Sequence, residues 1–255
     1  LLTNTTGDAN TSSGFNSMIG NVSGNGNIAY GAGALTSNSA GNSNSAAGTN
    51  SLFNNQSGNS NVAVGVAALY NTGNRSNLAA VGDSALYNNG VGAVNPYEAT
   101  ANSAFGSKAL YANTTGYYNT ATGSNALKNN TTGIQNTANG TGALFTNTTG
   151  GANTATGLNA LFQNSTGNNN TAVGNFTLPN NSSGNNNTGT GTGALSTNTT
   201  GNNNTAAGTG SLFSNTTGYS NVAIGTEALY KNTVRTNLVA VGDSALYNNG
   251  TGASF

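Results

Sequence analysis

The chain of 255 residues contains no cysteine and no histidine, and only 4% of its residues are charged. Without cysteine there is neither a disulfide framework nor a thiol nucleophile, and without histidine there is no imidazole base and no common ligand for a transition metal. The five acidic residues are scattered, so they provide neither the clustered carboxylates of a calcium site nor a catalytic carboxylate pair. We therefore expect that the chain is not an enzyme and binds no cofactor or metal.

Net charge and long apolar runs are also lacking. Five Lys and Arg balance five Asp and Glu, so there is no basic surface for nucleic-acid phosphates or anionic lipids. No apolar run approaches the ~20 residues that span a bilayer. We therefore expect neither nucleic-acid binding nor membrane insertion within these residues. The low hydrophobic content of 35% would suit a disordered chain, but such chains are usually highly charged, whereas this one is neutral and holds 10 Tyr and 8 Phe.

What the chain has instead is a repeat of 17 residues. Its consensus is N-T-A-x-G-x-x-A-L-x-x-N-T-T-G-x-x, and one step of 24 residues interrupts it. Leu follows each anchor glycine by four residues, with Met18 as the one substitute, and Asn follows by seven, with Thr72 as the one substitute. The anchor glycines are Gly14, Gly31, Gly48, Gly65, Gly82, Gly106, Gly123, Gly140, Gly157, Gly174, Gly191, Gly208, Gly225 and Gly242.

A fixed period of this size indicates a solenoid, in which each unit stacks on copies of itself. Seventeen residues are too few for a pair of helices, and Asn, Gly and Thr form helices poorly. The repeat therefore predicts an all-β fold, a single left-handed parallel β-solenoid over residues 1–255 with about 14 coils of 17 residues. Each coil is expected to hold one short strand, such as residues 221–225, and a second one, such as residues 244–249, with turns between them.

Stacking coils ~4.8 Å apart places each side chain above its counterpart in the next coil. Asn in such a column can donate amide to amide and also cap the turn, Leu faces inward, and Gly leaves no Cβ where another backbone passes. Representatives of these three columns are Gly123, Gly157, Gly208, Leu127, Leu161, Leu212, Asn130, Asn147 and Asn215.

An aromatic column lies five residues after the anchor glycine and is expected to face outward. One interpretation is apolar surface that packs against other copies of the chain in a homo-oligomer. The other is that the rings stack along one chain and shield its edge. The members are Phe53, Tyr70, Tyr87, Tyr111, Phe145, Phe162, Phe213, Tyr230 and Tyr247.

Two irregularities stand out. The 24-residue step holds a seven-residue insertion near residues 95–101, which is expected to form a surface loop. Residues 77–90 and 237–250 are nearly identical, so a longer duplication overlies the short repeat. Because of this duplication, and because both termini fall within a coil, we expect the chain to be a segment of a longer fibre.

Each duplicated string follows an arginine that alters the usual turn. Arg75 and Asp83 are eight residues apart, as are Arg235 and Asp243. The spacing predicts a local salt bridge that secures the turn. A receptor contact or a cation site is the alternative.

Two further columns allow a functional and a structural interpretation. Asn113, Asn130, Asn147, Asn198 and Asn215 begin N-x-[ST] sequons, so they are either glycan acceptors or turn residues that form the ladder. The column Thr120, Thr137, Thr154, Thr171, Thr188 and Thr205 resembles an ice-binding surface, but ordinary β-propensity also explains it.

The strings SNVAVGVAAL (60–69) and SNVAIGTEALYKN (220–232) resemble the head repeats of trimeric autotransporter adhesins. NSTGNNNTAVG (164–174) is similar to repeats in long bacteriophage tail fibres and bacterial surface fibre proteins. The resemblance implies a left-handed parallel β-roll with three chains packed side by side. The period of 17 is longer than in the adhesin heads, which weakens the trimer more than the fold.

The sequence thus favours a structural module of an extracellular fibre, at a cell surface or on a virion. It is expected to associate with itself, as a homotrimer or a head-to-tail filament. An adhesin head or tail-fibre segment that binds a surface glycan or receptor is the alternative, and an ice-binding solenoid is a lesser one.

Overall fold

The fold was obtained as a computed structural model, which describes residues 2–250. In this range each repeat forms one coil with a single three-residue strand, and the strands are parallel. The all-β parallel solenoid with a 17-residue spacing is therefore confirmed. Contacts within the chain define two compact units, unit 1 of residues 1–134 and unit 2 of residues 135–255.

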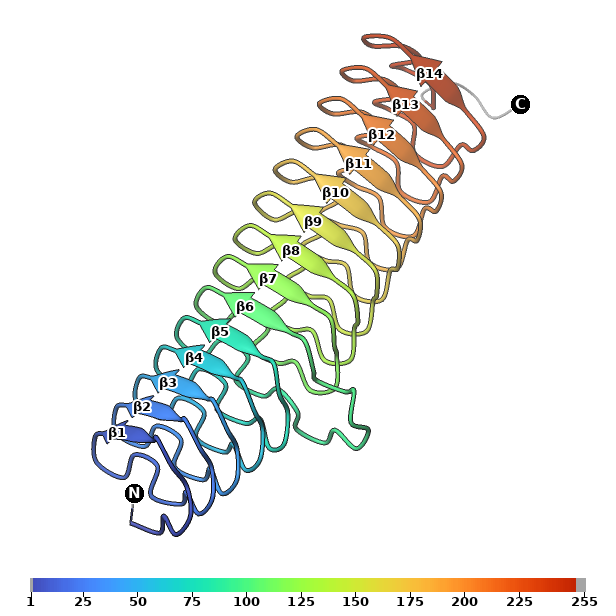
Figure 1. Cartoon of the computed structure of the whole chain (residues 1–255). Coiled ribbons are helices and arrows are strands. Elements are labelled where there is room, and N and C mark those ends of the chain that lie inside the picture. Colours follow the sequence, from blue (N-terminus) through green and yellow to red (C-terminus); the bar gives the residue numbers. More distant parts are fainter. Residues whose placement is uncertain (1, 251–255) are drawn as a thin grey trace. The chain divides into compact units, whose positions relative to one another are not determined.

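Unit 1 contains seven strands that pair in sequence order, with each strand in register on the next (Figure 1). Ala46 faces Ala63, for example, and Ala63 faces Ala80. The strands are β1 (Thr11–Ser13), β2 (Ile28–Tyr30), β3 (Ser45–Ala47), β4 (Val62–Val64), β5 (Ala79–Val81), β6 (Ser103–Phe105) and β7 (Thr120–Thr122).

Unit 2 repeats the arrangement without an insertion, so all its strands are 17 residues apart. They are β8 (Thr137–Asn139), β9 (Thr154–Thr156), β10 (Thr171–Val173), β11 (Thr188–Thr190), β12 (Thr205–Ala207), β13 (Val222–Ile224) and β14 (Val239–Val241).

The strands alternate between the interior and the solvent, as the period of two in an extended chain requires. In β7, Ala121 is buried while Thr120 and Thr122 are exposed. The middle residue is Ala in most strands. A small side chain fits there because the opposite wall of the same coil already brings a Leu into the interior.

The expected second strand of each coil is wrong. The segment that includes residues 244–249 consists of turns, because two of its residues in each coil have positive φ. In the coil of Leu161, φ is +53° at Asn159 and +52° at Leu161, whereas a strand needs φ near −120°. Each such residue costs ~1–2 kcal/mol. Bonds to the next coil offset this strain, since the N–H of Leu161 donates to the carbonyl of Thr177 at 3.0 Å.

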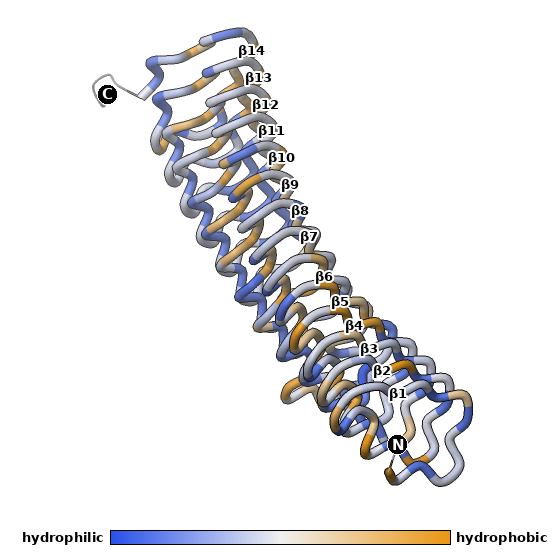
Figure 2. The backbone as a smooth tube through the Cα atoms, turned by 90° about the vertical axis from the view of Figure 1, so that its left-hand side faces the viewer, coloured by the Kyte–Doolittle hydropathy of each residue, from blue (hydrophilic) through white to orange (hydrophobic). Residues whose placement is uncertain are grey.

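The core is a column of leucines flanked by alanines. Leu127, Leu161 and Leu212 are fully buried, as predicted, and Met18 is buried in the same column. Leu246 in the last described coil is the exception, with half of its surface exposed. Residues of similar hydropathy recur from coil to coil within each unit (Figure 2).

The insertion between β5 and β6 forms a surface loop, as predicted. It projects from the row of coils in unit 1 (Figure 1). Val94 is 88% exposed, and Pro96 is exposed as well. The ring of Tyr97 holds the loop against the next coil through an edge contact with Tyr117, with ring centroids 5.6 Å apart.

Candidate functional site

The predicted Asn column forms a buried amide ladder. Nδ2 of Asn198 donates to Oδ1 of Asn181 at 2.8 Å and to the carbonyl of Gly201 at 3.1 Å. Asn215 donates in turn to Oδ1 of Asn198 at 2.8 Å. Each Asn therefore joins two coils and also caps its own turn. Fully buried members are Asn21, Asn38, Asn55, Asn89, Asn113, Asn130, Asn147, Asn164, Asn181, Asn198, Asn215 and Asn232.

A second buried ladder, which the sequence analysis missed, starts from the Asn four residues before each anchor glycine. Both the backbone N–H and Nδ2 of Asn187 donate to Oδ1 of Asn170, at 3.0 and 3.2 Å. Its Nδ2 also donates to the carbonyl of Gly201 at 2.7 Å. That carbonyl thus accepts from both ladders. The signal in the sequence is the Asn that opens N-T-A-x-G.

The anchor glycines stand where no side chain fits. Gly157 has φ +129°, and a Cβ there would lie 2.5 Å from the carbonyl oxygen of Gly174. Gly208 and Gly123 have similar φ angles of +133° and +127°. The prediction that a Cβ would collide at this column is confirmed for Gly157 and Gly208.

The outward rings stack on one another. In unit 1, Phe53, Tyr70, Tyr87 and Tyr111 follow at centroid distances of 5.0, 4.9 and 5.2 Å. Burial raises the pKa of Tyr87 above its ordinary value, and the neighbouring Tyr70 and Tyr111 add to this effect. Because the faces cover one another, the geometry favours the interpretation that the rings shield the edge of one chain. In unit 2 the stacks are Phe145–Phe162 and Phe213–Tyr230–Tyr247.

Arg75 holds the insertion rather than a carboxylate. Its Nη1 donates to the carbonyl of Asn95 at 3.0 Å, and its Nη2 donates to the carbonyl of Ala93 at 2.8 Å. Asp83 accepts a bond from the hydroxyl of Ser84 at 3.3 Å. The guanidinium is directed to the loop because the loop carbonyls lack ladder partners there.

The other predicted pair is not formed either. Between residues 2 and 250, no ion pair joins Arg235 to Asp243, or Arg75 to Asp83. The expected salt bridges are therefore corrected: residues eight apart in a coil face different walls, so the altered turn at Arg75 is secured by backbone carbonyls instead.

Glu98 closes the insertion from within. Its carboxylate accepts from the N–H of Val94 at 2.7 Å and from the N–H of Asn95 at 3.0 Å, and also from Nδ2 of Asn95 at 2.8 Å. The Asn95 side chain, its backbone N–H and that of Val94 lower the pKa of Glu98 below its ordinary value, and Arg75 adds a smaller effect. The loop is thus held from both sides and keeps a defined shape.

The sequon residues offer no free amide. Asn113, Asn130, Asn147, Asn198 and Asn215 are fully buried. Their Nδ2 atoms, to which a glycan would attach, donate to the turn glycines three residues later, as for Asn113 to Gly116 at 2.9 Å. The geometry therefore favours the structural interpretation of this column.

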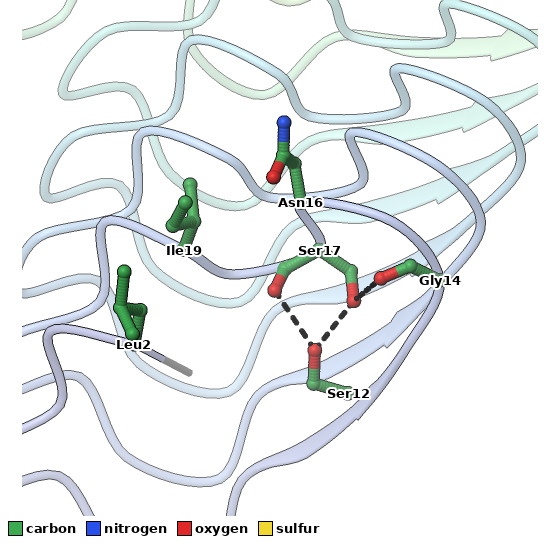
Figure 3. A pocket seen from close by; sticks show the side chains of 6 residues that line it. All are labelled: Leu2, Ser12, Gly14, Asn16, Ser17 and Ile19. Carbon is green, nitrogen blue, oxygen red and sulfur yellow. Dashed lines mark hydrogen bonds between the residues drawn. The ribbon is translucent and has the colours of Figure 1, made fainter.

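A recess of about 450 Å³ lies beside β1 and is lined by Leu2, Ser12, Gly14, Asn16, Ser17 and Ile19 (Figure 3). The hydroxyls of Ser12 and Ser17 lie 2.6 Å apart, and Ser17 Oγ donates to the carbonyl of Gly14 at 2.9 Å. No titratable side chain lines the recess. Its two hydroxyls therefore have no general base among the lining residues.

Two searches of the described range concern other kinds of site. No three His, Cys, Asp or Glu residues between positions 2 and 250 gather closely enough to hold a metal ion. Over the same positions, no helix has the length and apolar character needed to cross a membrane.

The outer face of the sheet differs between the units, which the sequence analysis did not anticipate. In unit 1 the outward strand positions carry large apolar side chains that are 36–52% exposed. We name this set the apolar sheet face, and its residues are Ile28, Tyr30, Val62, Val64, Val81 and Phe105. The first positions of β8 to β12 in unit 2 all carry Thr instead.

The sequence matches no family model, and no curated protein is significantly similar to it. The fold is compatible with β-roll repeats, and the function must be argued from the geometry of the columns and faces.

Proposed function

We propose that this chain is a structural module of an extracellular fibre, at a cell surface or on a virion, whose task is to hold a long β-solenoid rigid. The two buried amide ladders carry this proposal. In them each Asn bonds to the next coil and to its own turn, so a coil cannot tilt or slip without breaking buried hydrogen bonds. The resemblance to adhesin heads and tail fibres supports the same role.

The module associates with itself through the apolar sheet face. Exposed apolar side chains that lie together on one face usually mark a site of protein contact. Ile28, Tyr30, Val62 and Val64 lie on β2 and β4, and Tyr30 is 52% exposed. This face favours side-by-side packing, as in a homotrimer, over a head-to-tail filament.

Sedimentation of the whole chain over a range of concentrations tests this association. We expect a defined oligomer. The double variant Val64→Thr and Phe105→Thr, which installs the Thr typical of unit 2, should dissociate at least tenfold more readily with an unchanged melting temperature. Thr190→Ser in unit 2 is the matched control. A chain that stays monomeric at every concentration contradicts the side-by-side assembly.

A second role, a receptor-binding segment of an adhesin or tail fibre, is favoured by one observation, a groove beside Phe176 in unit 2. The Thr face of unit 2 does not carry a comparable case for ice binding. Asn139, Val173 and Ala207 interrupt the second Thr position of its strands.

A further inference from the structure

The ring column of unit 2 has a gap. Phe162 is followed at the same column position by Pro179 and then by Ser196, and the next ring is Phe213. Elsewhere in this unit, consecutive rings stack at centroid distances of 4.9–5.0 Å. Two successive coils therefore lack an aromatic ring, and no ring stacks on the side of Phe162 that faces Pro179.

A groove lies at this gap. It has a volume of about 400 Å³ and is lined by Asn159, Phe162, Phe176, Pro179, Asn180 and Ser196. This volume falls in the range of ~300–1,000 Å³ for small-ligand sites, which combine aromatic walls with a few polar groups. The groove has both elements, since rings and a proline face two carboxamides.

Phe176 is an unusual residue for its position. Its φ is +51°, and its side chain is 46% exposed. The same position in the neighbouring coils is Asn159 and Gly193, residues that tolerate a left-handed backbone. An aromatic residue gains little for the core when nearly half of it faces solvent. A strained backbone position that holds an exposed ring points to a role in binding.

The carboxamides at the groove have free hydrogen-bonding capacity. Nδ2 of Asn180 donates to the carbonyl of Ser196 at 2.8 Å. Within residues 2–250, Oδ1 of Asn180 accepts no hydrogen bond, and the carboxamide of Asn159 makes none. These groups differ from the ladder amides, whose bonds all go to other coils and turns.

The surroundings of the groove are neutral. No residue between Lys128 and Glu227 is charged. Phosphates, carboxylates and ammonium groups would find no partner of opposite charge here. The chemistry therefore suits an uncharged ligand with one apolar face and several hydroxyls.

We infer that the groove binds a hexopyranose unit of an uncharged glycan. The C–H face of the sugar ring packs against Phe176 and Phe162, continuing the ring column, and its hydroxyls bond to the carboxamides of Asn159 and Asn180. This inference goes beyond the fibre role and gives the receptor-binding candidate a specific site.

Titration of the ¹⁵N-labelled full chain tests the inference. Maltotetraose, cellotetraose and chitotetraose are the uncharged probes, and 3′-sialyllactose is the anionic one. We expect saturable shifts of the side-chain amide signals of Asn159 and Asn180 with at least one uncharged probe. Phe176→Asn, which installs the residue of the preceding coil, should weaken that binding at least tenfold.

The controls separate binding from folding and from assembly. Asn tolerates positive φ better than Phe, so Phe176→Asn should melt at the same or a higher temperature. Phe53→Ser, which removes the first ring of the unit 1 column, should leave the affinity unchanged. Saturation with none of the uncharged probes, equal affinity in Phe176→Asn, or saturation with sialyllactose alone overturns the inference. A chain that forms the oligomer in sedimentation but binds no sugar retains the fibre role and loses this site.

Discussion

Residues 77–90 and 237–250 are two copies of one string that differ only at Ala79 and Val239, yet their coils are packed differently. Leu86 in the first copy is fully buried, whereas Leu246 at the same place in the second is 50% exposed. The first copy has the coil of β6 stacked upon it, and no described residue stacks upon the second.

The amide ladder differs in the same way. Asn89 donates to the carbonyl of Ala99 at 2.7 Å and accepts from Asn102 and Asn113. In the second copy, Nδ2 of Asn249 is buried without a hydrogen-bond partner. Burial and bonding are therefore properties of a pair of neighbouring coils, as in other repeat proteins whose stability is a sum of nearest-neighbour terms. Matched substitutions in the two copies measure that neighbour term.

The glycine pair should give the largest difference. A Cβ at Gly82 would lie 2.6 Å from the carbonyl carbon and oxygen of Gly106, whereas at Gly242 the nearest atom would be 3.9 Å away. Both residues have similar positive φ. We expect Gly82→Ala to lower the free energy of unfolding by ~2–6 kcal/mol, from strain and overpacking together, and Gly242→Ala by only ~1–3 kcal/mol of strain. Denaturant unfolding measures both, and equal costs contradict the account.

The leucine pair comes next. Leu86→Ala empties a closed site and should cost ~2–5 kcal/mol, while Leu246→Ala removes a half-exposed side chain and should cost less than ~2 kcal/mol. The measurement is the shift of the urea midpoint at constant slope. A larger loss for Leu246→Ala would mean that the coil of the second copy is closed by packing that the described residues do not contain.

The asparagine pair tests the ladder alone. Asn89→Ala leaves Nδ2 of Asn102 and Asn113 short of an acceptor, which should cost ~1–3 kcal/mol. Asn249→Ala removes an amide nitrogen that has no partner, so its cost should be close to zero. Thermal melting of the two variants side by side decides the point, and a neutral Asn89→Ala contradicts the ladder.

The arginine pair should give the smallest global effect. Arg75→Ala releases the carbonyls of Ala93 and Asn95, so amide hydrogen exchange in residues 91–101 should speed up, with a stability change below ~1 kcal/mol. Arg235→Ala removes no such contact and should change neither quantity. Unchanged exchange in the loop of Arg75→Ala would show that Glu98 and Tyr97 hold it without the guanidinium.

The sequence predicted the coil, its period and its columns because a solenoid turns a linear repeat directly into spatial neighbours. The Gly157, Leu161 and Asn198 columns follow from this register alone. The second strand could not be predicted correctly, because Leu at positive φ contradicts its local propensity and is stabilised only by the adjacent coils. The partners of Arg75 depended on the path of the insertion, which is not part of the repeat.

The candidate sites were less predictable for a related reason. The groove beside Phe176 arises where Pro179 and Ser196 interrupt the ring column, so its signal is a departure from the consensus rather than a motif. The apolar sheet face depends on which strand positions point outward, and that became clear only once the strands were reduced to three residues.

The central claim is that like residues of successive coils are bonded amide to amide. Nuclear magnetic resonance can detect the scalar coupling across a hydrogen bond, from Nδ2 of Asn198 to Cγ of Asn181 and from Nδ2 of Asn181 to Cγ of Asn164. We predict both couplings, together with slow solvent exchange of these side-chain amides. Absent couplings with exchange as fast as that of a solvent-exposed asparagine would contradict the stacked register.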